Sequence, residues 1–122
     1  MRRGEVRWTT TKAPDKRRPV LNLTRDSAIG FLNALTVAPI TTTVRDIPSK
    51  VPLTPEDGLL THCAANMDNL QTVPKHRLGS LIAFLSPGRV LEVNRALAFA
   101  LGLDVPDLWS GSLWLQVTDD GR

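Results

Sequence analysis

Short stretches in which apolar and polar residues alternate recur over the first 85 residues of the chain. Such alternation is typical of β-strands with one buried face. It predicts strands at 4–9, 19–24, 32–42, 50–53, 61–66 and 79–85. Pro52 lies inside the fourth of these segments. Because proline cannot donate a hydrogen bond to a neighbouring strand, it predicts an edge strand or a bulge there.

The pattern changes to a helical one after residue 85. Ser86 is suited to cap a helix, Pro87 to occupy its first position and Gly102 to end it. The broad apolar face of this helix is formed by Val90, Leu91, Val93, Leu97 and Leu101. Two shorter segments, 25–31 and 73–77, predict single helical turns, the first of which could also be irregular. Several short strands followed by one helix predict a mainly β domain of the α+β class with a small barrel-like sheet.

The length of 122 residues fits one domain with a sizeable core. No apolar run approaches the ~18 residues of a membrane span, and no N-terminal segment resembles a signal peptide, so we expect a cytoplasmic protein without membrane association. Cys63 is the only cysteine, and His62 and His76 are the only histidines. The sequence therefore predicts neither an internal disulfide nor a metal or other cofactor.

The positive charge is concentrated towards the beginning of the chain. Residues 1–18 contain seven Lys and Arg residues against two acidic ones, whereas residues 104–122 contain four Asp residues against one Arg. Residues 1–103 alone have 14 basic against 8 acidic residues, compared with a net charge of +3 for the whole chain. A basic body indicates a polyanionic partner such as a nucleic acid, although it could also be a solubilising surface. The scarcity of aromatic residues argues against a binding sheet lined with stacked bases.

Two apolar segments that border polar residues suggest a phosphate site. Arg17 and Arg18 stand directly before Pro19, which favours an extended backbone and holds Arg18 at the start of a strand. The segment 35–40 is followed by Thr41, the first of three consecutive threonines. If these two strands pair, a guanidinium and a hydroxyl come together at one rim of the sheet, where they could bind a phosphate. The alternative is a solvated pair of arginines beside an ordinary strand end.

A second polar cluster follows the small-residue strand at 61–66. It consists of Asp68, Asn69, Gln71 and Thr72. Side-chain amides can read the base edges of single-stranded RNA, so this cluster is the candidate for sequence recognition. It could instead be a hydrogen-bonded loop that only braces the sheet.

Four other residues with polar, reactive or aromatic side chains are expected to be structural. We expect Trp8 in the core, Cys63 and His62 in the core or in an interface, and Asn66 at a strand end.

Six short segments occur in an order and at a spacing that characterise one protein family. They are Gly4-Glu5-Val6-Arg7-Trp8, Arg17-Arg18-Pro19-Val20-Leu21, Ala38-Pro39-Ile40-Thr41-Thr42-Thr43, Glu56-Asp57-Gly58, Ala65-Asn66-Met67-Asp68-Asn69-Leu70-Gln71-Thr72-Val73 and Leu85-Ser86-Pro87. Over residues 2–103 the sequence resembles the MazF/PemK family of toxins from type II toxin–antitoxin systems. It departs from the family pattern at Arg7, where an apolar or aromatic residue is usual, and at Asn22, which interrupts a strand that is normally aliphatic.

The resemblance implies an SH3-like small β-barrel with a C-terminal helix over residues 1–103, followed by an acidic, Trp-containing extension at 104–122. It implies a sequence-specific, metal-independent endoribonuclease that cleaves single-stranded RNA, mostly mRNA, to 2′,3′-cyclic phosphate and 5′-hydroxyl ends. It also implies a homodimer that is silenced by a MazE-like antitoxin. The family's catalytic arginine precedes the proline of the second strand, which makes it Arg18 here, and its catalytic threonine corresponds to Thr41.

The chemistry of these residues fits that implied role. Arg18 offers a planar fork for two phosphate oxygens, and Thr41 offers a hydroxyl donor. A guanidinium is a poor general base at neutral pH because its pKa lies above ~12, so stabilisation of transition-state charge is the expected contribution of Arg18. Lys16, Arg17 and Thr42 are expected to contact neighbouring parts of the substrate.

Two rival functions remain open at this point. A gyrase-binding toxin on the same barrel, as in the CcdB relatives, would rely on a C-terminal Trp-Gly-Ile, which this sequence lacks. A nucleic-acid-binding barrel without catalytic activity would share the basic surface.

Overall fold

The structure is a computed structural model that describes residues 1–10 and 16–103. The acidic extension expected at 104–122 lies outside the described residues, so the expected domain boundary after residue 103 is not described either. The strands are β1 (Glu5–Thr10), β2 (Arg17–Asn22), β3 (Ala34–Thr41), β4 (Lys50–Leu53), β5 (Cys63–Asn66), β6 (Gln71–Pro74) and β7 (Leu78–Phe84). The helices are α1 (Asp26–Ile29), α2 (Pro87–Leu101) and the short 3-10 helices η1 (Pro55–Asp57) and η2 (Lys75–Arg77).

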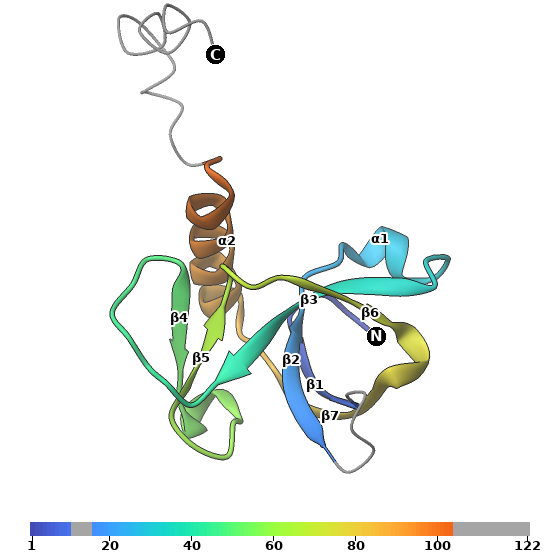
Figure 1. The fold of residues 1–122 in the computed structure, drawn as a ribbon, viewed down its shortest axis with the longest axis horizontal. Coiled ribbons are helices and arrows are strands. Elements are labelled where there is room, and N and C mark those ends of the chain that lie inside the picture. The colour runs from blue at the N-terminus through green and yellow to red at the C-terminus, as the bar shows by residue number, and fades with distance from the viewer. Residues whose placement is uncertain (11–15, 104–122) are drawn as a thin grey trace, which may run out of the picture.

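All seven strands belong to one strongly curled sheet in the order β4-β5-β3-β2-β1-β7, with β6 paired to β3 off this path (Figure 1). The long strand β3 is shared between neighbours. Val37 pairs with Asn22 of β2 on one edge and with Gln71 of β6 on the other, and beyond β6 the same edge pairs with β5. The sheet therefore curls into a half-barrel around β3, with α2 standing beside β4 and β5. The predicted mainly β fold with a C-terminal helix is confirmed.

Two clusters of buried residues hold the sheet together, and the alternation along β2 explains why there are two. Leu21 belongs to the larger cluster, which includes residues of β1, β4 and β5 and is closed by Val93 and Ala96 of α2. Its neighbour Val20 projects to the other face and joins a smaller cluster with Val37 and Val73. Both faces of β2 are therefore anchored, which gives the residues at its N-terminal end a firm base.

The predicted C-terminal helix is confirmed at both ends. Ser86 Oγ accepts a hydrogen bond of 3.3 Å from the backbone N–H of Arg89, as expected of a helix cap. Gly102 ends α2 with φ of 74°, a left-handed conformation that favours glycine. Pro52 lies in β4, the first strand in the sheet order, so the prediction of an edge strand there is also confirmed.

The helical turn predicted over 73–77 is only partly correct. The segment begins as strand β6, and the 3-10 helix η2 starts at Lys75. Val73 lies opposite Leu35 of β3 and is buried. Pairing with a distant strand therefore overrides the turn tendency of the local Pro74. Two strands also start two residues later than predicted, β3 at Ala34 and β5 at Cys63.

Hydrogen bonds accommodate the two departures from the family pattern. Arg7 Nε donates to Glu5 Oε1 at 2.9 Å, and Arg7 Nη1 donates to the carbonyl of Gly79 at 2.9 Å. Asn22 is buried, and its Nδ2 donates to the carbonyl of Arg2 at 3.0 Å. Both polar residues thus fasten the N-terminal segment to its neighbouring strands.

Candidate functional site

A cavity of about 780 Å³ opens inside the curl of the sheet, and each of the seven strands contributes at least one lining residue. The described lining residues include basic side chains but no carboxylate. The basic ones are Lys16, Arg17, Arg18 and Lys50. A concave surface lined by charges of one sign concentrates the electrostatic potential, so this cavity favours an anionic ligand.

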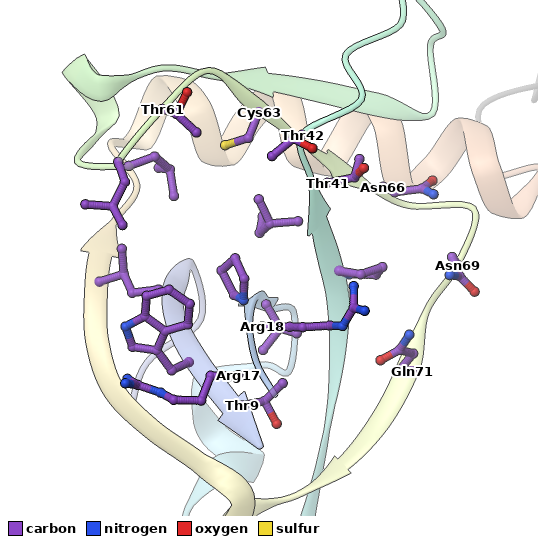
Figure 2. A pocket seen from close by; sticks show the side chains of 18 of the residues that line it. Thr9, Arg17, Arg18, Thr41, Thr42, Thr61, Cys63, Asn66, Asn69 and Gln71 are labelled. Atoms are coloured by element: carbon purple, nitrogen blue, oxygen red, sulfur yellow. The ribbon is translucent and has the colours of Figure 1, made fainter. Parts of the chain in front are cut away.

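Arg18 and Thr41, the predicted catalytic pair, both line this cavity. Val20 of β2 lies opposite Pro39 of β3, the last pair of that ladder, and Arg18 and Thr41 each lie two residues beyond it. Residues two apart along a strand share a face. Residues opposite each other in paired strands project to the same face. In Figure 2 the Arg18 side chain reaches towards Gln71, on the side of the cavity where Thr41 lies. The structure therefore places a guanidinium and a hydroxyl that are 23 residues apart in the sequence in the lining of one cavity.

The surroundings of Thr41 leave its hydroxyl able to donate. Thr41 Oγ1 accepts a hydrogen bond of 3.1 Å from the backbone N–H of Thr43, which fixes the oxygen and leaves its hydrogen for another acceptor. Thr42 also lines the cavity, but it follows β3 and lies near Cys63 instead (Figure 2). Of the two threonines, Thr41 is the one that shares a face of the sheet with Arg18.

Arg17 does not lie beside Arg18, because consecutive residues of a strand project to opposite faces. Its guanidinium carbon lies 4.7 Å from the centre of the Trp8 ring, a cation–π contact. Trp8 is half-buried and lines the cavity, so the prediction of a core position for this residue is wrong. The pairing of Trp8 with Pro19 makes Arg17 its diagonal neighbour on the same face, a proximity that depends on the strand register.

The cavity is also lined by apolar residues, among them Leu59, Leu60 and Ile82. Cys63 also lines it, with 3% of its surface exposed, so the expected burial of this residue is confirmed. Burial, followed by the negative charge of Asp57, raises the pKa of the Cys63 thiol, which therefore stays protonated at neutral pH. The neighbouring His62 is exposed, so of the two expected environments, core or interface, the core is excluded for it.

The structure divides the predicted recognition cluster. Asn69 and Gln71 line the cavity (Figure 2). Thr72 lies opposite Thr36 of β3 and is exposed, since β6 turns it to the face away from Gln71. Asp68 accepts a hydrogen bond from the Ser49 hydroxyl and does not belong to the described lining. Asp68 thus braces the loop, which was the alternative reading of the cluster.

Several lining residues were not predicted from the sequence. They are Trp8, Thr9, Pro19, Val20, Pro39, Ile40, Lys50, Leu59, Leu60, Thr61, Cys63, Asn66 and Ile82. Most of the apolar ones read as ordinary strand residues, and no local pattern distinguishes them. Lys50 and Asn66 reach the cavity through the pairing of β4 with β5, which the sequence does not reveal.

Among residues 1–10 and 16–103, no group of three or more His, Cys, Asp or Glu side chains is placed to hold a metal ion. Neither histidine belongs to the cavity lining. Within the same ranges, no helix combines the length and the apolar composition needed to cross a membrane.

Comparison with known proteins settles the family. A model of the PemK-like, MazF-like toxins of type II toxin–antitoxin systems matches residues 2–101. The chain belongs to this family. The match covers every described strand and the whole of α2, so the cavity lies inside the family domain.

Individual MazF proteins of Mycobacterium tuberculosis are similar over most of their length. Endoribonuclease MazF3 is 41% identical over 90 residues, which are 74% of this chain and 87% of that protein. Probable endoribonuclease MazF2 is 37% identical over 103 residues, which are 84% of this chain and 99% of that protein.

Solved structures of the family show the same fold. The M. tuberculosis toxin MazF-mt6 superposes with a TM-score of 0.74 and 37% identity, covering 82% of this chain and 98% of that one. An endoribonuclease from a mycobacterial species, in complex with its cognate antitoxin, gives a TM-score of 0.75 and 30% identity, covering 87% of this chain and 99% of that one.

Proposed function

We propose that this protein is an endoribonuclease toxin that cleaves single-stranded RNA, mostly mRNA, at specific sequences. One observation carries the proposal. A cavity lined by four cations and no described carboxylate holds Arg18 and Thr41 on one side, within a domain whose relatives include named endoribonucleases.

The proposed reaction is an attack of a ribose 2′-hydroxyl on the adjacent phosphate. The O2′–P bond forms, the P–O5′ bond breaks, and the products end in a 2′,3′-cyclic phosphate and a 5′-hydroxyl. Negative charge builds on the non-bridging oxygens in the transition state. In this proposal the Arg18 fork and the Thr41 hydroxyl stabilise that charge.

Proton transfer has no dedicated side chain in this proposal. The 2′-hydroxyl must lose a proton and the leaving 5′-oxygen must gain one. No described lining residue is His, Asp or Glu, so we assign both transfers to water. The enzyme then acts by electrostatic stabilisation and positioning, with no metal ion required.

We also propose the partners that the family implies, which are a second copy of the chain and a MazE-like antitoxin. The mycobacterial endoribonuclease with 30% identity forms a complex with its cognate antitoxin, which supports this part of the proposal. An antitoxin that neutralises this protein would have to keep RNA from the cavity. The proposed location of the protein is the cytoplasm.

A cleavage assay with a long single-stranded RNA in excess EDTA tests the activity. We expect cleavage to persist, with 5′-hydroxyl and 2′,3′-cyclic phosphate ends, and Arg18→Ala to reduce the rate by roughly 10²–10³-fold through loss of a charge contact in the transition state. Arg45→Ala is the matched control, because Arg45 is exposed and does not line the cavity. A requirement for added Mg²⁺, or equal activity of Arg18→Ala and the control, would contradict the proposal. Binding of the RNA without cleavage would instead support a nucleic-acid-binding barrel without catalytic activity.

A further inference from the structure

The strand register aligns three polar residues of the cavity wall on one face. Thr41 of β3 lies opposite Ala64 of β5, and Lys50 of β4 lies opposite Asn66 of β5. Opposite residues share a face, and so do residues two apart along a strand. Thr41, Asn66 and Lys50 therefore form a row across β3, β5 and β4, and all three line the cavity.

The side chain of Asn66 is oriented by its own loop. Its Oδ1 accepts a hydrogen bond of 3.0 Å from the backbone N–H of Asp68, which assigns the other end of the amide as the NH₂ group. The nitrogen of this NH₂ group donates no hydrogen bond to another residue within the described part of the chain. Figure 2 shows Asn66 next to Thr41 at the cavity rim. Asn66 thus presents a fixed donor beside the Thr41 hydroxyl.

The backbone at Lys50 is equally well held. Its N–H donates to the carbonyl of Ile47 at 2.9 Å, and the preceding Ser49 is buried and accepts from the N–H of Met67 at 2.9 Å. Lys50 is half-buried as a residue, and its ammonium makes no ion pair or hydrogen bond with the described residues. The nearby Asp68 carboxylate accepts from Ser49 and does not line the cavity. Lys50 thus lines the cavity without an ion pair to a described carboxylate, and it also lines a smaller cavity that includes Glu92 of α2.

We propose that Lys50 and Asn66 bind a second phosphate of the substrate, adjacent to the one held by Arg18 and Thr41. An ammonium and an amide NH₂ group are both donors, so together they suit the oxygens of a phosphate. The backbones of β3 and β4 lie two strand spacings apart, roughly 10 Å, which suits a phosphate other than the one at Thr41. This contact would place the RNA strand across the row of donors and hold the scissile phosphate at Arg18. The inference rests on the proposed function.

A binding assay with a labelled single-stranded DNA oligonucleotide of random sequence tests it, because DNA lacks the 2′-hydroxyl and cannot be cleaved by this reaction. Affinity is measured at several salt concentrations for the wild type, Lys50→Gln and Asn66→Asp. Loss of one phosphate contact should reduce the magnitude of the slope of log affinity against log salt by about 0.7 in Lys50→Gln. Asn66→Asp keeps the oxygen that accepts from Asp68 but replaces the donor with a negative charge, so affinity should fall about tenfold or more.

Matched controls make the same changes of charge elsewhere. Arg95→Gln and Asn94→Asp alter exposed residues of α2 that do not line the cavity. Equal salt slopes for Lys50→Gln and Arg95→Gln, or equal affinities for Asn66→Asp and Asn94→Asp, would overturn the inference. Melting temperatures show whether each variant is folded, and either of the two cavity variants alone is sufficient for the test.

Measurements on the wild-type protein distinguish failure of this inference from failure of the proposed function. If the wild type cuts RNA and binds the oligonucleotide but the cavity variants match their controls, only the second phosphate site is wrong. If the wild type neither cuts RNA nor binds the oligonucleotide, the proposed function itself fails.

Discussion

At the scale of single residues, the cavity separates two arginines that are neighbours in the chain. Arg18 faces the polar wall with Thr41 and Gln71, whereas Arg17 covers the ring of Trp8 on the other side. Part of the Arg17 guanidinium surface is thus already engaged by an aromatic partner. We therefore expect Arg18 to contact the reacting phosphate and Arg17 to make contacts at the edge of the cavity.

The two threonines at the end of β3 provide a test of this geometry. Thr41→Val keeps the shape of the side chain and removes the donor, so we expect cleavage to slow by roughly 10²–10³-fold. Thr42→Val is the comparison and should slow cleavage far less, because Thr42 is expected only to contact a neighbouring part of the substrate. Single-turnover cleavage of one RNA by both variants measures the effect. A slow Thr42→Val beside a normal Thr41→Val would show that the wrong threonine has been assigned.

Asn69 and Gln71 are expected to select the sequence that is cut. Replacing either with Ala removes an amide that can pair with a base edge, so preference among sites should change by roughly tenfold or less while overall cleavage continues. Mapping the 5′ ends of products from one transcript measures this preference. Thr72→Ala, on the outward face of the same strand, is the control. If the cut sites of all three variants match the wild type, the role of Asn69 and Gln71 is structural.

The sequence identified the cavity residues whose signal is local. Arg18 stands before a proline, Thr41 ends an apolar run, and Asn69 and Gln71 form a polar cluster. Lys50 and Asn66 could not be found in this way, because neither has an unusual neighbour and each reaches the cavity only through cross-strand pairing.

At the scale of whole elements, the helix was easier to predict than the small strands. The helix α2 has its own start and stop signals in Ser86, Pro87 and Gly102. Strand β6 has no such signals, because it is defined by its pairing with one edge of β3. The curl of the sheet depends on the pairing of β3 with three other strands, β2, β5 and β6. This pairing exists only in the assembled sheet and leaves no local pattern in the sequence.

The contact between η1 and α2 gives a prediction about the dependence of stability on pH. Asp57 Oδ1 accepts from Arg89 Nε at 2.9 Å, and its Oδ2 accepts from the backbone N–H of Thr54 at 2.9 Å. Burial alone would raise the pKa of Asp57, but the hydrogen bonds from Arg89 and from the Thr54 backbone outweigh it and lower the pKa below the ordinary value of 3.8. The folded protein therefore favours the ionised carboxylate, and this stability is lost as the pH falls below about 3.8.

Asp57→Asn should accordingly reduce the free energy of unfolding by about 1–3 kcal/mol at neutral pH, because asparagine cannot accept both hydrogen bonds. The difference from the wild type should shrink as the pH falls through the range in which Asp57 takes up its proton. Urea unfolding at a fixed protein concentration measures it, with Glu56→Gln, an exposed neighbour in η1, as the control. A difference that stays constant from neutral to acidic pH would contradict the assigned role of the ionised carboxylate.

At the scale of the whole molecule, charge is distributed as the proposed activity requires. Residues 1–103 carry 14 basic and 8 acidic residues, and four of the basic ones line the cavity without a described carboxylate. A long polyanion would thus be attracted to the body of the protein as well as to the reacting residues. The acidic extension at 104–122 works against this attraction, since it lowers the net charge of the whole chain to +3.

We therefore propose that this extension weakens binding of nucleic acid. Truncation after Leu103 should give tighter binding of a single-stranded oligonucleotide at low salt. The gap from the full-length protein should narrow as the Debye length falls from ~10 Å at 0.1 M to ~3 Å at 1 M salt. A full-length variant with Asn in place of Asp104, Asp107, Asp119 and Asp120 separates the charge of the extension from its apolar residues. If charge is the cause, this variant and the truncated protein should bind alike, whereas equal affinities of the truncated and full-length proteins at every salt concentration would refute the proposal.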